Sequence, residues 1–451
     1  MNQINVSEVI DQGKLAPLQL MVLLLCTVCL IIDGFDVQAL GYVAPAIMRD
    51  WHVAKSVFGP VFGAGLLGMT LGAILMGAIA DKVGRRPVLI ASLLFLGAFS
   101  FATARCTALN ELLVLRFFTG LSMGAIIPNA IALAGEFSPA RIRVSLMMLT
   151  SSGFIIGGAV GGGLAAVLIP AYGWQSVFLV GALAPLALAV IMLLFLPESV
   201  QFMVLRERPA EHIRATLSRI APRLQLGAAS VFTVPETRGK GVHVAQLFRQ
   251  QMATGTVLLW VVNFMNLICA YFLANWLPIM MSEAGHSPAH AVLAGTMLWV
   301  GGLLGNLILG WLVERHGFGP VMTAMFCTGT LSIATIGLVA ASLPPALMVI
   351  SVAGFCVMGG QSALNALAAT YYPTAVRMTG IGWAMGIGRL GSILGPLIGG
   401  ELMRLNWPVR HLFLAAAIPT LIAVVASLLF WWKVALPSAA KAKANAEQEA
   451  A

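Results

Sequence analysis

Long apolar stretches follow one another along most of this chain, and they constrain its fold more than any other feature. About 20 apolar residues in a helix cross a bilayer core roughly 30 Å thick. A mean hydropathy of +0.92 and a charged fraction of 10% lie outside the range of soluble globular domains. We therefore predict an all-α integral membrane protein with twelve transmembrane helices. The predicted spans are residues 18–47, 56–80, 87–104, 111–134, 144–169, 174–196, 254–281, 289–313, 320–342, 345–371, 379–405 and 411–434.

Positive charge fixes the expected orientation of these spans. Of the 26 Lys and Arg residues, 15 fall in connections after even-numbered spans and five after odd-numbered ones. Because basic connections stay in the cytoplasm, both termini are predicted to be cytoplasmic. The net charge of +9 then reflects membrane topology, and no nucleic acid is expected as a partner.

The polar segments complete the predicted organisation. Residues 1–17 form a cytoplasmic N-terminal segment without the residue order of a cleaved signal peptide. Residues 197–250 form a cytoplasmic linker, with an amphipathic helix expected near 209–220 on the inner membrane surface. Residues 437–451 are expected to be a disordered cytoplasmic tail.

An internal repeat divides the spans into two six-helix halves, residues 18–196 and 251–436. Four pairs of markers recur at an offset of 233 or 234 residues: Pro45 with Pro278, the segment GAIADKVGRRP (77–87) with GWLVERHGFGP (310–320), Pro139 and Arg143 with Pro373 and Arg377, and Trp174 with Trp407. Halves related by an axis along the membrane normal are typical of transporters that bind substrate near the midplane and alternate access.

Two acidic residues, Asp33 and Asp36, lie near the middle of the first span. An acid at the centre of a membrane helix costs about 2.5–3.5 kcal/mol, so such residues usually serve a function. The i, i+3 spacing places both on one face of the helix and indicates a proton or cation site. The alternative is one acid that a buried partner neutralises for structural reasons.

Arg116 lies about six residues into the fourth span and cannot lose its charge, so it needs a partner in the membrane. Asp36 is the predicted partner, because the helix rise separates the two in depth by only about 7 Å. The alternative is that Arg116 extends to the outer surface. Asp33, Asp36 and Arg116 are together predicted to couple transport to protons.

Arg389 is the other basic residue deep inside a span, near the midplane of the eleventh. No acid of the second half lies at a matching depth, and an uncompensated arginine is what a carboxylate-binding site presents. Amide and aromatic residues on nearby spans are the expected lining of a site for a small organic anion. They are Asn263, Asn266, Tyr271, Phe272, Phe355, Gln361, Asn365 and Trp383.

The connection between the second and third spans is similar to the loop motif of the major facilitator superfamily. The matching residues are Gly77, Asp81, Gly84, Arg85 and Arg86, and the second-half copy keeps Glu314 and Arg315. The resemblance implies that this motif acts as a conformational latch. Glu136, at the inner end of the fourth span, is expected to pair with Arg141 or Arg143 in a cytoplasmic gate, and Arg377 is the repeat counterpart of Arg143.

Within that superfamily the chain resembles the aromatic acid:proton symporter family over essentially its whole length. The similarity rests on Asp33-Gly-Phe-Asp36-Val-Gln and on Tyr372-Pro-Thr-Ala-Val-Arg377-Met-Thr-Gly380. It implies a multi-pass protein of the bacterial inner membrane that imports benzoate-type acids for aromatic hydrocarbon catabolism. The proton gradient is the implied driving force, with no cofactor and no metal. The fifth span lacks the Gly-Pro of the superfamily's antiporter motif, which argues against proton-driven efflux.

The expected partners are therefore a small aromatic carboxylate, protons and the lipid bilayer, and the protein is expected to work as a monomer. Transport of another organic anion, such as an aliphatic dicarboxylate, and export of a drug or metabolite stay open as alternatives. A non-transporting membrane sensor is a remote one. An enzyme is not expected, because the sequence contains no metal-binding cluster, nucleophile triad or phosphate-binding loop.

Overall fold

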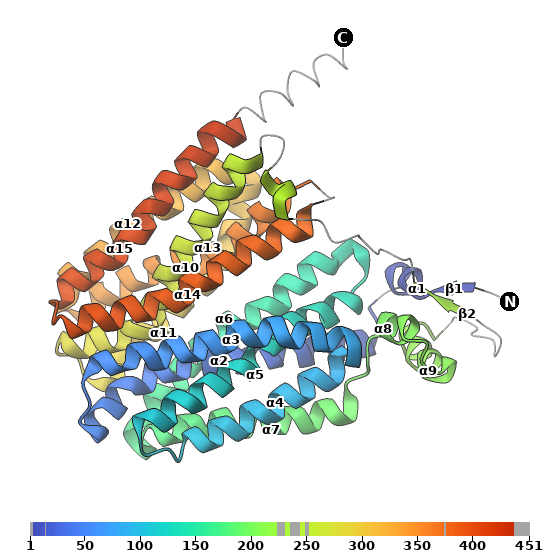
Figure 1. The fold of residues 1–451 in the computed structure, drawn as a ribbon, viewed down its shortest axis with the longest axis horizontal. Coiled ribbons are helices and arrows are strands. Elements are labelled where there is room, and N and C mark those ends of the chain that lie inside the picture. The colour runs from blue at the N-terminus through green and yellow to red at the C-terminus, as the bar shows by residue number, and fades with distance from the viewer. Residues whose placement is uncertain are drawn as a thin grey trace, which may run out of the picture. The chain divides into compact units, whose positions relative to one another are not determined.

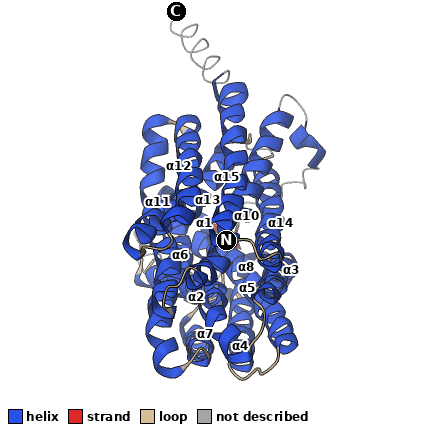
Figure 2. Ribbon diagram, turned by 90° about the vertical axis from the view of Figure 1, so that its left-hand side faces the viewer, coloured by secondary structure: helices blue, strands red, loops and turns tan. Residues whose placement is uncertain are grey.

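A computed structural model describes residues 3–13, 15–222, 231–234, 244–248, 252–373 and 376–436. Helices make up nearly all of the described chain (Figure 2). Twelve of them are long and apolar enough to cross a membrane, which confirms the predicted number. They are α2 (Pro17–Trp51), α3 (Phe58–Val83), α4 (Arg85–Thr103), α5 (Leu109–Glu136), α6 (Arg143–Tyr172), α7 (Gln175–Phe195), α10 (Met252–Glu283), α11 (Pro288–His316), α12 (Phe318–Val339), α13 (Leu343–Tyr371), α14 (Arg377–Arg404) and α15 (Val409–Phe430).

Short elements occupy the N-terminal segment and the linker. Strand β1 (Gln3–Asn5) pairs in parallel with β2 (Val231–Thr233), and α1 (Val6–Gln12) and α8 (Val200–Leu205) are short helices. Single helical turns lie at Lys55–Val57, Ala140–Ile142, Val244–Phe248 and Trp431–Ala435. Parts of the linker and the whole predicted tail, 437–451, lie outside the described residues.

The predicted amphipathic helix is present as α9 (Ala210–Ile220). Its buried residues are Ile213, Leu217 and Ile220, at the i, i+4, i+7 spacing of one helix face. The opposite face carries exposed polar groups such as Arg219. The linker therefore presents an apolar face to the protein at this helix.

The chain divides into two compact units. The first comprises Met1–Ala39, Ala64–Gly161 and Tyr172–Arg238, and the second comprises Leu40–Gly63, Gly162–Ala171 and Gly239–Ala451. Within the first, α4 packs along α5 and α7; within the second, α10 packs along α14 and α15, and α11 along α13 (Figure 1).

The second unit has a dense apolar core where α10, α12, α13 and α15 meet. Val262, Phe326, Leu364 and Ala423 are buried there. Large apolar side chains also cover outward-facing helix surfaces, as at Leu331, which is 69% exposed. An apolar exterior around an apolar core is the pattern of a protein whose solvent is lipid.

The sequence repeat is visible as repeated local geometry. Gly84 and Gly317, 233 residues apart, end α3 and α11 with positive φ angles of 116° and 81°. Only glycine adopts such backbone angles at little cost, so both tight turns depend on it. Arg143 and Arg377 also match, because each Nε donates to the carbonyl oxygen five residues earlier, at 3.1 and 3.2 Å.

Candidate functional site

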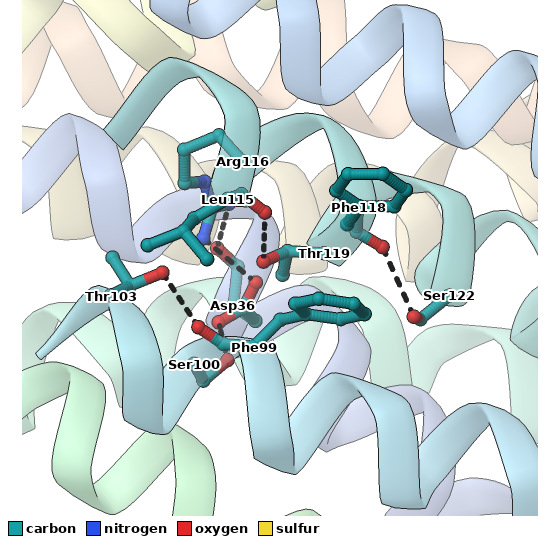
Figure 3. Close-up of polar contacts among 9 residues, drawn as sticks. All are labelled: Asp36, Phe99, Ser100, Thr103, Leu115, Arg116, Phe118, Thr119 and Ser122. Carbon is teal, nitrogen blue, oxygen red and sulfur yellow. Dashed lines mark hydrogen bonds and ion pairs between the residues drawn. The ribbon is translucent and has the colours of Figure 1, made fainter. Parts of the chain in front are cut away.

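The predicted pairing of Asp36 with Arg116 is present inside the first unit (Figure 3). Arg116 Nη1 lies 3.1 Å from Asp36 Oδ2, and Nη2 donates to the Asp36 main-chain oxygen at 3.2 Å. Asp36 is fully buried and Arg116 is 3% exposed, so Arg116 does not extend to the outer surface. A buried pair of this kind is costly to desolvate, and removing one partner leaves the other charge uncompensated.

Ser100 on α4 completes the coordination of Asp36, since its hydroxyl donates to Oδ1 at 3.1 Å. The neighbouring hydroxyls in Figure 3 behave differently. Thr103, Thr119 and Ser122 each donate to a carbonyl oxygen four residues earlier in their own helix. Ser100 is thus a member of the site that our sequence interpretation missed, and the only available signal was a hydroxyl within an apolar span.

Asp33 lies one helical turn before Asp36 and is also fully buried. Gly34, between the two acids, is required by packing: a Cβ atom at this position would overlap the main chain of Phe154 on α6. The Asp-Gly-Phe-Asp sequence therefore combines two acids with the small residue that lets α6 approach them closely.

A second polar cluster lies inside the second unit and consists of amides from α10 and α13. Gln361 Nε2 donates to Asn263 Oδ1 at 3.1 Å and to Asn365 Oδ1 at 3.2 Å. Asn266 Nδ2 donates to Gln361 Oε1 at 3.0 Å and to the Val357 carbonyl at 3.2 Å. We call these four side chains, Asn263, Asn266, Gln361 and Asn365, the amide network.

One acceptor of the amide network is unused. Asn266 Oδ1 is buried and has no hydrogen-bond partner among the described residues. Asn266 also stands 233 residues after Asp33, at the repeat offset. The second half therefore carries a neutral amide at the position where the first half carries an acid.

Arg389 lies on α14, next in sequence to a glycine that approaches this network. A Cβ atom at the adjacent Gly388 would be 3.6 Å from Asn263 Cβ, so the two helices come close at this depth. Arg389 is partly exposed, and no ion pair to it occurs among the described residues. This agrees with the expectation of a cation in the second half without a protein carboxylate.

The remaining predicted lining residues are dispersed. Trp383 is 44% exposed and stacks on Trp260 with ring centroids 5.9 Å apart. Phe355 packs against the apolar core, Phe272 is 3% exposed, and Tyr271 is half-buried. The hydrogen bonds described above join the four amides into one cluster.

The loop motif forms an ion-pair network at the inner end of the first unit. Arg85 Nε lies 2.8 Å from Glu136 Oε1, and Arg85 Nη2 lies 3.9 Å from Asp81 Oδ1. Glu198 accepts hydrogen bonds from the main-chain N–H groups of Arg85 and Arg86 at 3.2 and 3.3 Å. Its carboxylate therefore caps the N-terminus of α4, a role that sequence reasoning did not assign.

The predicted pairing of Glu136 with Arg141 or Arg143 is wrong. Arg143 pairs with Asp11 of α1 at 2.8 Å, and Arg141 donates to the Gly13 carbonyl at 3.4 Å. Arg141 lies just before α6 and Arg143 is the first residue of that helix, and both bind the N-terminal segment. Glu136 pairs with Arg85 instead. Proximity in sequence was a poor guide because the fold brings α4 to the end of α5.

The other predicted gating residues make fewer contacts. Glu314 and Arg315 are exposed at the end of α11, where the Arg315 guanidinium lies 5.5 Å from the Trp311 ring centroid. Gly77 has open space beside it. Among the described residues, no group of three or more His, Cys, Asp and Glu side chains could hold a metal ion.

Twelve membrane-length helices, a repeated six-helix plan and buried ionisable residues define a multi-pass membrane protein with the architecture of secondary transporters. The chain belongs to the Major Facilitator Superfamily, which matches residues 26–358 and 259–451. It is thus a member of a transporter family and not an enzyme. The chain also resembles the solved structure of a D-xylose-proton symporter, with a TM-score of 0.69 and 17% identity over 91% of this chain and 97% of that one.

Characterised bacterial relatives are more similar in sequence. The 4-hydroxybenzoate transporter PcaK of Pseudomonas putida is 38% identical over 94% of both chains. The gallate transporter of the same species is 38% identical, again over 94% of both. The benzoate transport protein of Acinetobacter baylyi is 33% identical over 95% of this chain and 92% of its own. These relatives are aromatic acid transporters of the same superfamily.

Proposed function

We propose that this protein imports a small aromatic carboxylic acid together with protons across the bacterial inner membrane by alternating access. The observation that carries the proposal is the buried ion pair between Arg116 and Asp36, with a second buried acid one turn away. The names of the relatives support the substrate class, since they transport hydroxybenzoate, gallate and benzoate.

The proton site is assigned to the two acids of α2, with different roles. Arg116 and Ser100 both bind the Asp36 carboxylate, so this acid already has a cation and a hydroxyl as partners. Protonation of Asp36 would break that pair and leave a buried arginine uncompensated. We therefore propose that Asp33 carries the transported proton. Asp36 is proposed to hold the Arg116 side chain in place.

The substrate carboxylate is assigned to Arg389. A guanidinium binds a carboxylate through two parallel hydrogen bonds, and the structure gives Arg389 no competing acid among the described residues. The amide network lies at the same depth and offers the Asn266 Oδ1 acceptor to a polar ring substituent.

The loop-motif network is assigned to the cytoplasmic gate. Arg85 joins α4 to the end of α5 through Glu136, and Glu198 joins α4 to the segment after α7. Opening of the cytoplasmic side requires helices to move, and these contacts would have to break or shift as that happens. The proton gradient supplies the driving force, without a cofactor.

Uptake into proteoliposomes with an imposed inward proton gradient tests the proposal. The substrates compared are radiolabelled 4-hydroxybenzoate, benzoate and gallate, with succinate as the aliphatic control. We expect accumulation of at least one aromatic acid above the level reached in protein-free liposomes under the same gradient, abolished by a protonophore. Accumulation of succinate alone, or uptake that is indifferent to the protonophore, would refute it.

A further inference from the structure

A cavity of about 520 Å³ lies in the first unit, away from the ion pair and the amide network. It is bordered by the inner half of α4, the ends of α3 and α7, and the linker helices α8 and α9. The lining residues are Val83, Arg86, Pro87, Ile90, Ala91, Leu94, Leu193, Glu198, Phe202, Met203, Arg208 and His212.

One wall of this cavity is apolar and continues the membrane-facing surface. Leu94 on α4 is 46% exposed and Leu193 on α7 is 57% exposed. Leu94 is nine residues into α4, which places it roughly 13 Å from the cytoplasmic end of that helix. The wall thus reaches the depth of lipid acyl chains and is open to them.

The other end of the cavity is basic. Arg86, Arg208 and His212 line it, and Glu198 is its one acid. Glu198 is occupied by the main-chain N–H groups at the start of α4, and no ion pair from it to a basic residue occurs among the described residues. The two arginines therefore keep a net positive charge at this end.

Arg86 holds positive charge at a fixed place on this end of the cavity. Its Nη2 donates to the Leu193 carbonyl at 2.6 Å, which fixes the side chain at the rim of the cavity. A guanidinium fixed in this way binds an anion with little further loss of side-chain freedom.

We propose that this cavity binds an anionic phospholipid of the inner leaflet. The phosphate is bound by Arg86 and Arg208, and an acyl chain lies against Ile90, Leu94 and Leu193. A basic rim above an apolar wall is the arrangement that recognises a lipid headgroup and its chain together. Such a lipid joins α9 to α4 and α7, beside the contacts that Glu198 makes with α4.

Native mass spectrometry of the full-length protein tests this inference. The purified protein is titrated with phosphatidylglycerol and with phosphatidylcholine of identical chains, and thermal unfolding is followed with the same lipids and with inorganic phosphate. Arg208→Gln removes one headgroup contact, and Leu94→Trp fills the acyl wall. Arg219→Gln, on the exposed face of α9, is the matched control.

We expect phosphatidylglycerol to bind about 10-fold more tightly than phosphatidylcholine, since the choline group of phosphatidylcholine brings a positive charge next to the two arginines. Arg208→Gln should lose that preference, Leu94→Trp should weaken the binding of both lipids, and Arg219→Gln should keep both the affinity and the preference. Equal binding of the two lipids, or an unchanged preference in Arg208→Gln, would overturn the inference. Stabilisation by inorganic phosphate to the same extent would also overturn it, because it would identify a site for a free anion.

Discussion

Arg116 binds Asp36 twice, through the carboxylate oxygen Oδ2 at 3.1 Å and through the main-chain oxygen at 3.2 Å. Arg116 therefore binds both the main chain of α2 and the charged carboxylate of Asp36. The ion pair therefore joins α5 to α2 one helical turn away from Asp33. This placement is the reason for assigning Asp36 and Arg116 a positioning role beside the proposed proton site.

Asp36→Asn should destabilise the protein more than most substitutions in the chain. It leaves the Arg116 charge buried without a counter-charge, at a cost of about 3–5 kcal/mol. The measurement is the free energy of unfolding in mixed micelles. Asp36→Leu combined with Arg116→Met removes both charges, and it should recover much of the lost stability while transport stays absent.

Ser100→Ala provides the graded comparison for that experiment. It removes one hydrogen bond to Asp36 and leaves the ion pair in place, so we expect a loss of about 1–2 kcal/mol. If Asp36→Asn is no more destabilising than Ser100→Ala, the ion pair contributes less to the free energy of unfolding than we expect.

Asp33→Asn should separate proton coupling from substrate movement. An amide cannot bind the transported proton, but it preserves the size and hydrogen-bonding capacity of the side chain. We expect exchange of labelled for unlabelled 4-hydroxybenzoate to continue while uphill accumulation is lost. Accumulation at the wild-type level by this variant would remove Asp33 from the proton pathway.

The sequence was sufficient for the features that depend on one-dimensional patterns. Hydropathy predicted all twelve long helices, and the 233-residue offset related the two segments in which the structure has turns at Gly84 and Gly317. Depth along the helix was enough to pair Asp36 with Arg116, because two opposite charges inside an apolar span have few alternatives.

Contacts that depend on how helices face one another were not predictable in this way. Glu136 was assigned to nearby arginines, but it pairs with Arg85, which is 51 residues earlier in the chain. Glu198 reaches the start of α4 from 113 residues away. Depth and spacing leave the rotation of each helix about its axis undetermined, and that rotation decides which polar groups meet.

A double-mutant cycle should detect the Arg85–Glu136 pair directly. Both side chains are largely buried, so we expect a coupling free energy of about 1 kcal/mol between Arg85→Gln and Glu136→Gln. The cycle between Arg141→Gln and Glu136→Gln should give no coupling, since these side chains are not paired. Coupling in the second cycle and none in the first would restore the sequence-based pairing and contradict the structure.

Arg389→Gln should weaken binding of 4-hydroxybenzoate about 10- to 100-fold, because a charge-assisted pair of hydrogen bonds is lost. Arg389→Lys should fall between this variant and the wild type, since lysine keeps the charge but not the two-pronged geometry. Calorimetry in detergent measures the affinity. Arg404→Gln, near the outer end of the same helix, serves as the control and should bind 4-hydroxybenzoate normally. Equal weakening in both variants would show that Arg389 is not a specific binding residue.

The most direct test of proton-coupled aromatic acid transport is a measurement of proton movement itself. Purified protein is placed in liposomes with a trapped pH dye, and 4-hydroxybenzoate is added outside. Protein-free liposomes and the Arg389→Gln variant report the passive entry of neutral acid. The account predicts saturable inward proton movement that exceeds both controls and follows substrate uptake. Substrate uptake without any carrier-dependent proton movement would contradict it.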